Sequence, residues 1–104
     1  DYTYVGDIVQ GLIKSVAFPV RYGIYNLSGD QSTSLKELIV ELELAAGMKA
    51  LVQYQPFQPG DMLRTRADLT QARKDLGYEP EVALREGLRR TVAWVREELQ
   101  RVGT

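Results

Sequence analysis

The feature that most constrains the fold is a long amphipathic stretch near the C-terminus. Apolar residues recur there every three or four positions over roughly five helical turns, with arginines and glutamates on the opposite side. They are Leu84, Leu88, Val92, Val95, Leu99 and Val102. A helix of this kind must bury its apolar face against another element, and only 104 residues are present to supply one. Folding at this size hides about two-thirds of the unfolded surface, so we expect one small domain with a thin core.

Three shorter helices are predicted upstream of this stretch. Apolar spacing predicts the first over residues 8–16, ending before Pro19. The second is expected from Ser34 to Gly47 and the third from Asp68 to Gly77, because each begins at a capping signature and ends at a glycine. The predicted N-terminal caps are Asp7 for the first helix, Ser34 with Glu37 for the second, and Asp68 with Gln71 for the third.

Two short strands are predicted between the helices. Residues 22–27 are aromatic and β-branched and precede a Ser-Gly-Asp turn, and residues 51–55 alternate apolar with polar before two prolines. Since two strands do not stabilise a sheet alone, the expected fold class is mixed α/β and helix-rich, with about four helices and few short strands. No linker divides the chain, so residues 1–104 are expected to form one domain.

The composition argues against several classes of function. Cysteine and histidine are absent, which removes disulfides, thiol nucleophiles, imidazole bases and the usual zinc ligands. The 13 basic and 14 acidic residues leave no overall field for nucleic acid, so a helix-turn-helix nucleic-acid binder over residues 68–102 is ranked last. No apolar run approaches the ~18 to 20 residues of a membrane span, and no signal pattern opens the chain. We therefore expect a cytoplasmic protein without membrane or nucleic-acid partners.

Four strings of residues occur in the order and spacing of one enzyme family. They are Asp-Tyr-Thr-Tyr-Val-Gly-Asp at 1–7, Gln-Pro-Gly-Asp at 58–61, the stretch 68–80 that ends in Leu-Gly-Tyr-Glu-Pro, and the helix 84–94. Together they resemble the C-terminal segment of NAD-dependent nucleotide-sugar epimerases and dehydratases of the extended short-chain dehydrogenase/reductase superfamily. The resemblance extends over nearly the whole chain. Within the family, the chain is similar to UDP-glucose and UDP-glucuronate 4-epimerases in particular.

This resemblance implies that the loop around residue 60 holds a UDP-sugar. A proline and a glycine bring the backbone close to a ligand, a carboxylate accepts hydrogen bonds from a ribose, and a guanidinium forks onto phosphate. The implied substrate-binding residues are Gln58, Asp61, Arg64, Arg66 and Asn26. Gln58 stands where galactose-type epimerases carry arginine, and Gln-Pro-Gly-Asp is similar to glucuronate-type epimerases, which favours UDP-glucuronate or a relative. The alternative is a solvated turn with surface arginines.

The family's chemistry lies outside these residues. Its members bind NAD through a glycine-rich turn of a Rossmann domain and act through a Tyr-x-x-x-Lys pair, and neither pattern occurs here. The resemblance therefore implies a C-terminal substrate-binding part that is not catalytic alone. No catalytic residue is assigned, NAD is expected only in the intact parent enzyme, and a Rossmann domain is the expected partner.

A second hypothesis comes from a different class of function. The chain is then a free-standing interaction or oligomerisation module that assembles through exposed apolar faces and takes no ligand. Both hypotheses predict self-association of the isolated chain, as a dimer or a larger species.

Overall fold

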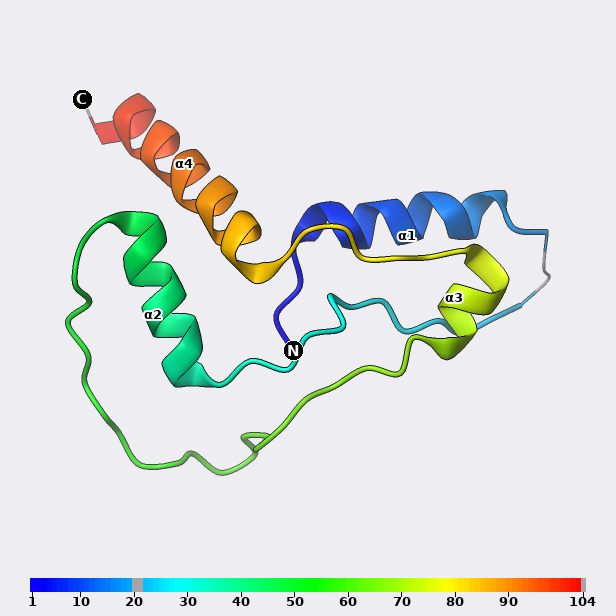
Figure 1. Ribbon diagram of the computed structural model, residues 1–104, viewed down its shortest axis with the longest axis horizontal. Helices are drawn as coiled ribbons and strands as arrows, with labels where there is room; N and C mark the ends of the chain where they lie inside the picture. Colours follow the sequence, from blue (N-terminus) through cyan, green and yellow to red (C-terminus); the bar gives the residue numbers. More distant parts are fainter. Residues whose placement is uncertain (20–21, 104) are drawn as a thin grey trace.

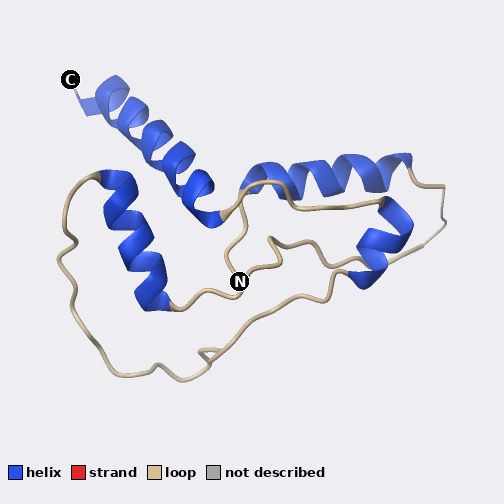
Figure 2. Cartoon of the chain, in the orientation of Figure 1, coloured by secondary structure: helices blue, strands red, loops and turns tan. Residues whose placement is uncertain are grey.

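The computed structural model describes residues 1–19 and 22–103. This part of the chain contains four helices and no strand: α1 (Val5–Ala17), α2 (Leu35–Ala46), α3 (Thr70–Leu76) and α4 (Leu84–Gly103), joined by long extended segments (Figure 2). The prediction of a small, helix-rich fold with four helices is confirmed.

The helices lie in two pairs. α2 packs against α4, and α1 packs against α3 (Figure 1). The N-terminal residues run between the two pairs, while the connection from α2 to α3 swings out in a wide loop along one side of the molecule. This loop carries most of the residues that the sequence assigned to substrate.

The two predicted strands do not form. Residues 22–27 and 51–55 lie outside any strand, and neither segment has a neighbouring strand within the described chain. They lie on opposite sides of the molecule, one beside α3 and the other in the wide outer loop (Figure 2). A strand is stabilised by cross-strand pairing, which its own sequence cannot supply, so the alternation at 51–55 yields extended chain only.

The predicted residues at the helix ends are confirmed for both ends of α2 and for the C-terminal end of α3. The Ser34 hydroxyl accepts the N–H of Glu37, and Gly47 ends α2 in the left-handed region at φ 70°. Gly77 ends α3 at φ 65°. At the other end of α3 the predicted cap is one residue off, because Leu69 holds the cap position and Asp68 instead accepts the N–H and hydroxyl of Thr70.

Asp7 is not the N-cap that its position suggested. α1 begins at Val5 with Tyr4 as the cap residue, which places Asp7 in the first turn at 2% exposure. Its two carboxylate oxygens accept the backbone N–H groups of Glu81 at 2.9 Å and Val82 at 3.2 Å. These charge-assisted bonds join α1 to the segment that leads into α4, a distant contact that a search for local caps could not find.

The best-packed region lies at the α1–α3 end. Its buried apolar residues are Leu69, Ala72, Leu76 and Tyr78, with Phe18, Tyr25, Leu27 and Ala67 packed around them. The Tyr78 hydroxyl donates to the Ser28 carbonyl oxygen at 2.8 Å, and Lys14 Nζ donates to the Gly77 carbonyl oxygen at 2.9 Å. The α2–α4 pair is much more open, since α2 buries no residue and α4 buries only Gly87.

The arginines of α4 form a solvated, charge-paired helix face. Glu86 bonds to both Arg89 and Arg90, which holds the pKa of its carboxyl at about 2. The Arg90 guanidinium also lies 5.4 Å from the ring centre of Tyr4. Both cations are therefore paired within the helix.

Candidate functional site

The loop around residue 60 contains a tight turn that closes on itself. The Gln58 N–H donates to Asp61 Oδ2 and the Asp61 N–H donates to the Gln58 carbonyl oxygen, each at 3.1 Å. Gly60 sits between them at φ 91°, a conformation that favours glycine. The Gln58 side-chain amide donates to the Pro56 carbonyl oxygen at 3.2 Å. Gln58 and Asp61, the two predicted site residues of the turn, are exposed. One carboxylate oxygen of Asp61 is already hydrogen-bonded within the turn.

A hollow of about 550 Å³ lies between this loop, the N-terminal residues and the start of α2. Its lining residues are Asp1, Tyr2, Ser32, Thr33, Ser34, Leu35, Phe57, Met62, Leu63, Arg64 and Thr65. The volume falls within the roughly 300 to 1,000 Å³ that is usual for small-molecule sites. Aromatic, hydroxyl and cationic groups meet here, a combination suited to a nucleotide.

Arg64 supplies the positive charge of this hollow. Within the described chain its guanidinium has no ion pair or hydrogen bond, and the hydroxyls of Ser32 and Thr33 make no side-chain hydrogen bond there either. Asp1 is the carboxylate among the lining residues, and its Oδ2 accepts the Ala67 N–H at 3.1 Å. Several hydrogen-bond donors are therefore available to an incoming acceptor.

Arg66 lies in a different environment from Arg64. It lines a second, polar hollow of about 380 Å³ beside α3, where its guanidinium is 3.9 Å from Asp30. Arg73 bonds the same Asp30 at 2.8 Å and the carboxylate of Glu79 at 3.0 Å. The hydrogen bonds from Arg73 hold the pKa of the Glu79 carboxyl below its usual range. Asp30 itself adopts φ 55°, and its backbone N–H donates to the Ser28 hydroxyl at 3.2 Å.

The five predicted site residues thus separate into four places. Gln58 and Asp61 form the turn, Arg64 faces the large hollow, and Arg66 faces Asp30. Asn26 lies near α3, where its side-chain amide is 3.5 Å from the Asp68 carbonyl oxygen. Their roles toward substrate stay predictions.

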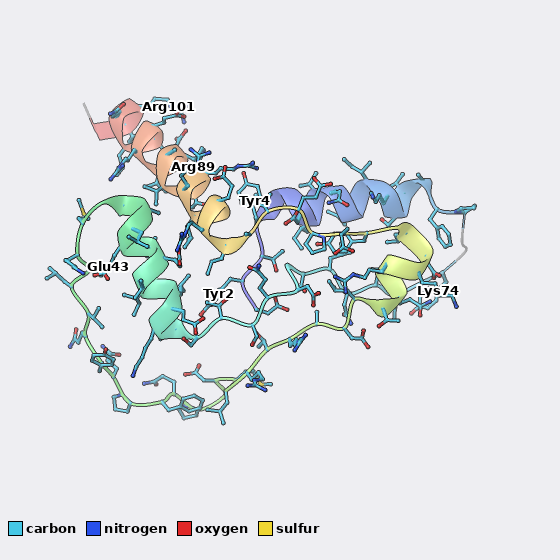
Figure 3. The ribbon with its side chains drawn as sticks, viewed as in Figure 1. Tyr2, Tyr4, Glu43, Lys74, Arg89 and Arg101 are labelled. Carbon is cyan, nitrogen blue, oxygen red and sulfur yellow. The ribbon has the colours of Figure 1, made fainter. Side chains whose placement is uncertain are left out.

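Sequence reasoning missed the groups that complete the large hollow. The hydroxyls come from Ser32 and Thr33, just before the cap of α2, and the aromatic faces come from Tyr2 and Phe57. The Ser-Thr-Ser run at 32–34 is the signal that could have found them, since hydroxyls at a helix start leave donors beside the positive end of the helix dipole. Figure 3 shows Tyr2 between the N-terminus and α2.

The N-terminal residue positions the segment that carries the two arginines. The Asp1 amino group donates to the Thr65 hydroxyl at 3.2 Å, and its carboxylate accepts the Ala67 N–H. These two contacts lie on either side of Arg66 in the sequence. They hold the far end of the wide loop against the body of the protein.

The described residues contain no dinucleotide-binding βαβ unit. The sequence offers no glycine-rich phosphate turn, and residues 1–19 and 22–103 contain no strand from which a dinucleotide-binding βαβ unit could be built. The same described residues show no cluster of three or more acidic, histidine or cysteine side chains that could hold a metal. None of their helices combines the length and apolar character needed to cross a membrane.

Known proteins give a consistent set of relatives. No family model matches the chain. A UDP-glucuronate 4-epimerase of Thermodesulfobacterium geofontis is 41% identical over 101 residues, covering 96% of the chain and 31% of the relative. A UDP-glucose 4-epimerase of Mycolicibacterium smegmatis is 33% identical over 100 residues, covering 96% and 32%. The crystal structure of a Stenotrophomonas maltophila UDP-glucose 4-epimerase, with bound NAD and formylated UDP-arabinopyranose, superposes with a TM-score of 0.90 at 28% identity, covering 98% and 31%.

By these matches the chain is similar to the C-terminal part of NAD-dependent nucleotide-sugar epimerases. Within that class the two curated relatives are UDP-glucuronate and UDP-glucose 4-epimerases. The chain spans about 30% of the length of the proteins it matches.

Proposed function

We propose that this chain is the substrate-binding part of an NAD-dependent enzyme that interconverts UDP-sugars. The observation that carries the proposal is the match, over 96% of the chain, to a UDP-glucuronate 4-epimerase at 41% identity. In the intact enzyme NAD would oxidise a sugar hydroxyl and later return the hydride, with both the cofactor and the catalytic residues supplied by the remaining domain. The share of these 104 residues is to hold the nucleotide.

The geometry of the large hollow supports a nucleotide ligand. Tyr2 and Phe57 expose 40% and 62% of their side chains at its edge, where an aromatic face can stack on a base. Arg64 offers an unpaired guanidinium in the same hollow. Gln58 and Asp61 follow on the adjacent turn, with one Asp61 oxygen still available to a ribose hydroxyl.

The exposed surface supports a large partner. The chain exposes 8448 Å², whereas a compact monomer of its 11.7 kDa mass would expose about 5,900 Å². The excess of about 2,500 Å² on this chain alone is of the size buried in obligate interfaces. We propose a Rossmann domain as the partner in the intact enzyme and a cytoplasmic location for it.

The alternative function is an interaction module that binds no ligand. The excess surface favours an interaction module as much as it favours an enzyme segment, since a partner would cover the exposed apolar faces in either case. Ligand binding distinguishes the two, because only the enzyme segment has a use for a nucleotide.

A two-dimensional amide NMR titration of the 104-residue chain tests the proposal. With UDP in millimolar excess, we expect shifts in residues 57–68 and 32–35, and little response to NAD. A well-dispersed spectrum that ignores UDP would favour the interaction module. For the intact enzyme the matching test is NAD-dependent 4-epimerisation of UDP-glucuronate, followed by chromatography of the sugar nucleotides.

A further inference from the structure

The loop and its surroundings contain three arginines, and their partners differ. Arg73 is held by two carboxylates at 3.0 Å or less, and Arg66 has Asp30 within 3.9 Å. Arg64 has no such partner in the described chain and lines the large hollow. A guanidinium that is already paired must break that pair before it binds an anion, whereas an unpaired one only has to lose water.

The groups around Arg64 are donors for an anion. The hydroxyls of Ser32 and Thr33 line the same hollow without a side-chain partner in the described chain. α2, a helix of 12 residues, begins at Leu35 on its rim, so the positive end of the helix dipole adds to the charge of the arginine. Asp1 also lines the hollow, and its carboxylate opposes an anion: Oδ2 accepts the Ala67 N–H, whereas Oδ1 is buried without a hydrogen-bond partner.

We propose that Arg64 is the diphosphate-binding residue of this segment, together with the hydroxyls of Ser32 and Thr33, and that Arg66 instead positions the loop through Asp30. The inference rests on the proposed function, which supplies the nucleoside diphosphate as the ligand class. It goes further by assigning the two arginines different roles and by placing the phosphates in the hollow at the start of α2.

The experiment compares three arginine variants of the 104-residue chain, Arg64→Gln, Arg64→Lys and Arg101→Gln, with three probes. Arg64→Gln removes the proposed contact, and Arg101→Gln is the control with the same change in charge. Arg101 lies at the far end of α4, paired with Glu98 at 2.8 Å and well away from the hollow (Figure 3). Affinities for UDP, uridine and inorganic pyrophosphate are measured by amide NMR titration at one ionic strength.

A charge-assisted contact of this kind is worth about ten- to a hundredfold in affinity. We expect Arg64→Gln to weaken the affinity for UDP and for pyrophosphate by about tenfold or more and to leave the affinity for uridine unchanged. Arg101→Gln should change none of the three affinities. Arg64→Lys should fall between, because lysine keeps the charge and loses the fork. Amide spectra of the free variants verify that each is folded.

The outcomes separate this inference from the proposed function. If UDP binds and Arg64→Gln has no more effect than Arg101→Gln, the role of Arg64 is refuted while the proposed function stands. If pyrophosphate binds through Arg64 but UDP binds no better than pyrophosphate, the anion site stands and the nucleotide function fails. If neither phosphate compound binds the unmodified chain, both are refuted.

Discussion

Replacing Asp7 with alanine removes the acceptor of two backbone N–H groups at once. The carboxylate is 2% exposed and bonds Glu81 and Val82 at 2.9 and 3.2 Å. A hydrogen bond to a charged group contributes about 1.5 to 3 kcal/mol, so two bonds set the scale at about 3 to 6 kcal/mol. Both donors lie in a partly buried region, where water can reach them in the variant. The lower end, about 3 kcal/mol, is therefore expected, against a total stability of about 5 to 15 kcal/mol.

Urea unfolding followed by circular dichroism measures this loss. With a slope of about 1.5 kcal/mol per molar, 3 kcal/mol lowers the midpoint by about 2 M. Asp7→Asn keeps one acceptor and presents an amide N–H to the second donor. Its urea midpoint should therefore lie between those of the unmodified chain and of Asp7→Ala. Glu97→Ala, which removes an exposed carboxylate from α4, is the control and should leave the midpoint unchanged. A midpoint for Asp7→Ala within about 0.5 M of the unmodified chain would refute the reasoning.

Three further predictions concern the core and its edge. Tyr78→Phe removes the bond to the Ser28 carbonyl oxygen and should cost about 1 kcal/mol, a fall of about 4 to 8 °C in thermal midpoint; an unchanged midpoint would show that the bond adds nothing. Gly77→Ala places a side chain at φ 65° and should cost about 1 to 2 kcal/mol by the same melt, whereas a stabilised variant would contradict the assigned conformation. Arg73 lowers the folded-state pKa of Glu79 from its usual 4.5, so the stability from this pair is complete above pH 4.5 and is lost as pH falls further. Glu79→Gln should flatten this dependence in urea midpoints between about pH 3 and 6, and an unaltered acid slope would rule the pair out.

The helices could be predicted because their signals are local. Ser34 and Glu37, or Gly47 and Gly77, lie within one turn of the ends that they mark, and the structure places them there. The strands could not be predicted correctly, because a strand at 51–55 depends on a neighbour that the described chain does not provide. Periodicity shows which residues share a face, but it does not show whether a pairing partner exists.

The candidate site shows the same limit. The sequence identified the loop and the tight turn at Gln58 to Asp61, whose geometry depends on adjacent residues. It could not distinguish Arg64 from Arg66, since both are exposed arginines two positions apart. The difference lies in a distant partner, Asp30, which contacts only the second of them. Asp7 was misassigned for the same reason, because its two partners lie more than 70 residues away.

The apolar face of α4 is only partly buried by the rest of the chain. Its first turns pack against α2 and Tyr4, but Val95, Leu99 and Val102 remain 40%, 66% and 77% exposed. α1 has a second uncovered face on the side away from α3, where Val5, Val9, Leu12 and Val16 follow one another at intervals of four, three and four residues. Those side chains are 46% to 87% exposed. The radius of gyration is 16.8 Å, where about 13 Å is usual for this length, in keeping with the wide outer loop and the two separate helix pairs in Figure 1.

Water-exposed stripes of this kind drive association unless another domain covers them. The isolated 104-residue chain is therefore expected to form dimers or larger species, with a mass by light scattering that rises with concentration. Val9→Lys with Leu12→Glu on α1 should shift the association equilibrium toward the monomer, because the two charged side chains would lose their hydration when the chains associate. The control variant, Arg89→Glu with Glu97→Lys, introduces the same two residue types on the exposed face of α4 and should leave the mass unchanged. A clean monomer at high concentration in the unmodified chain would refute the prediction that the exposed stripes drive self-association.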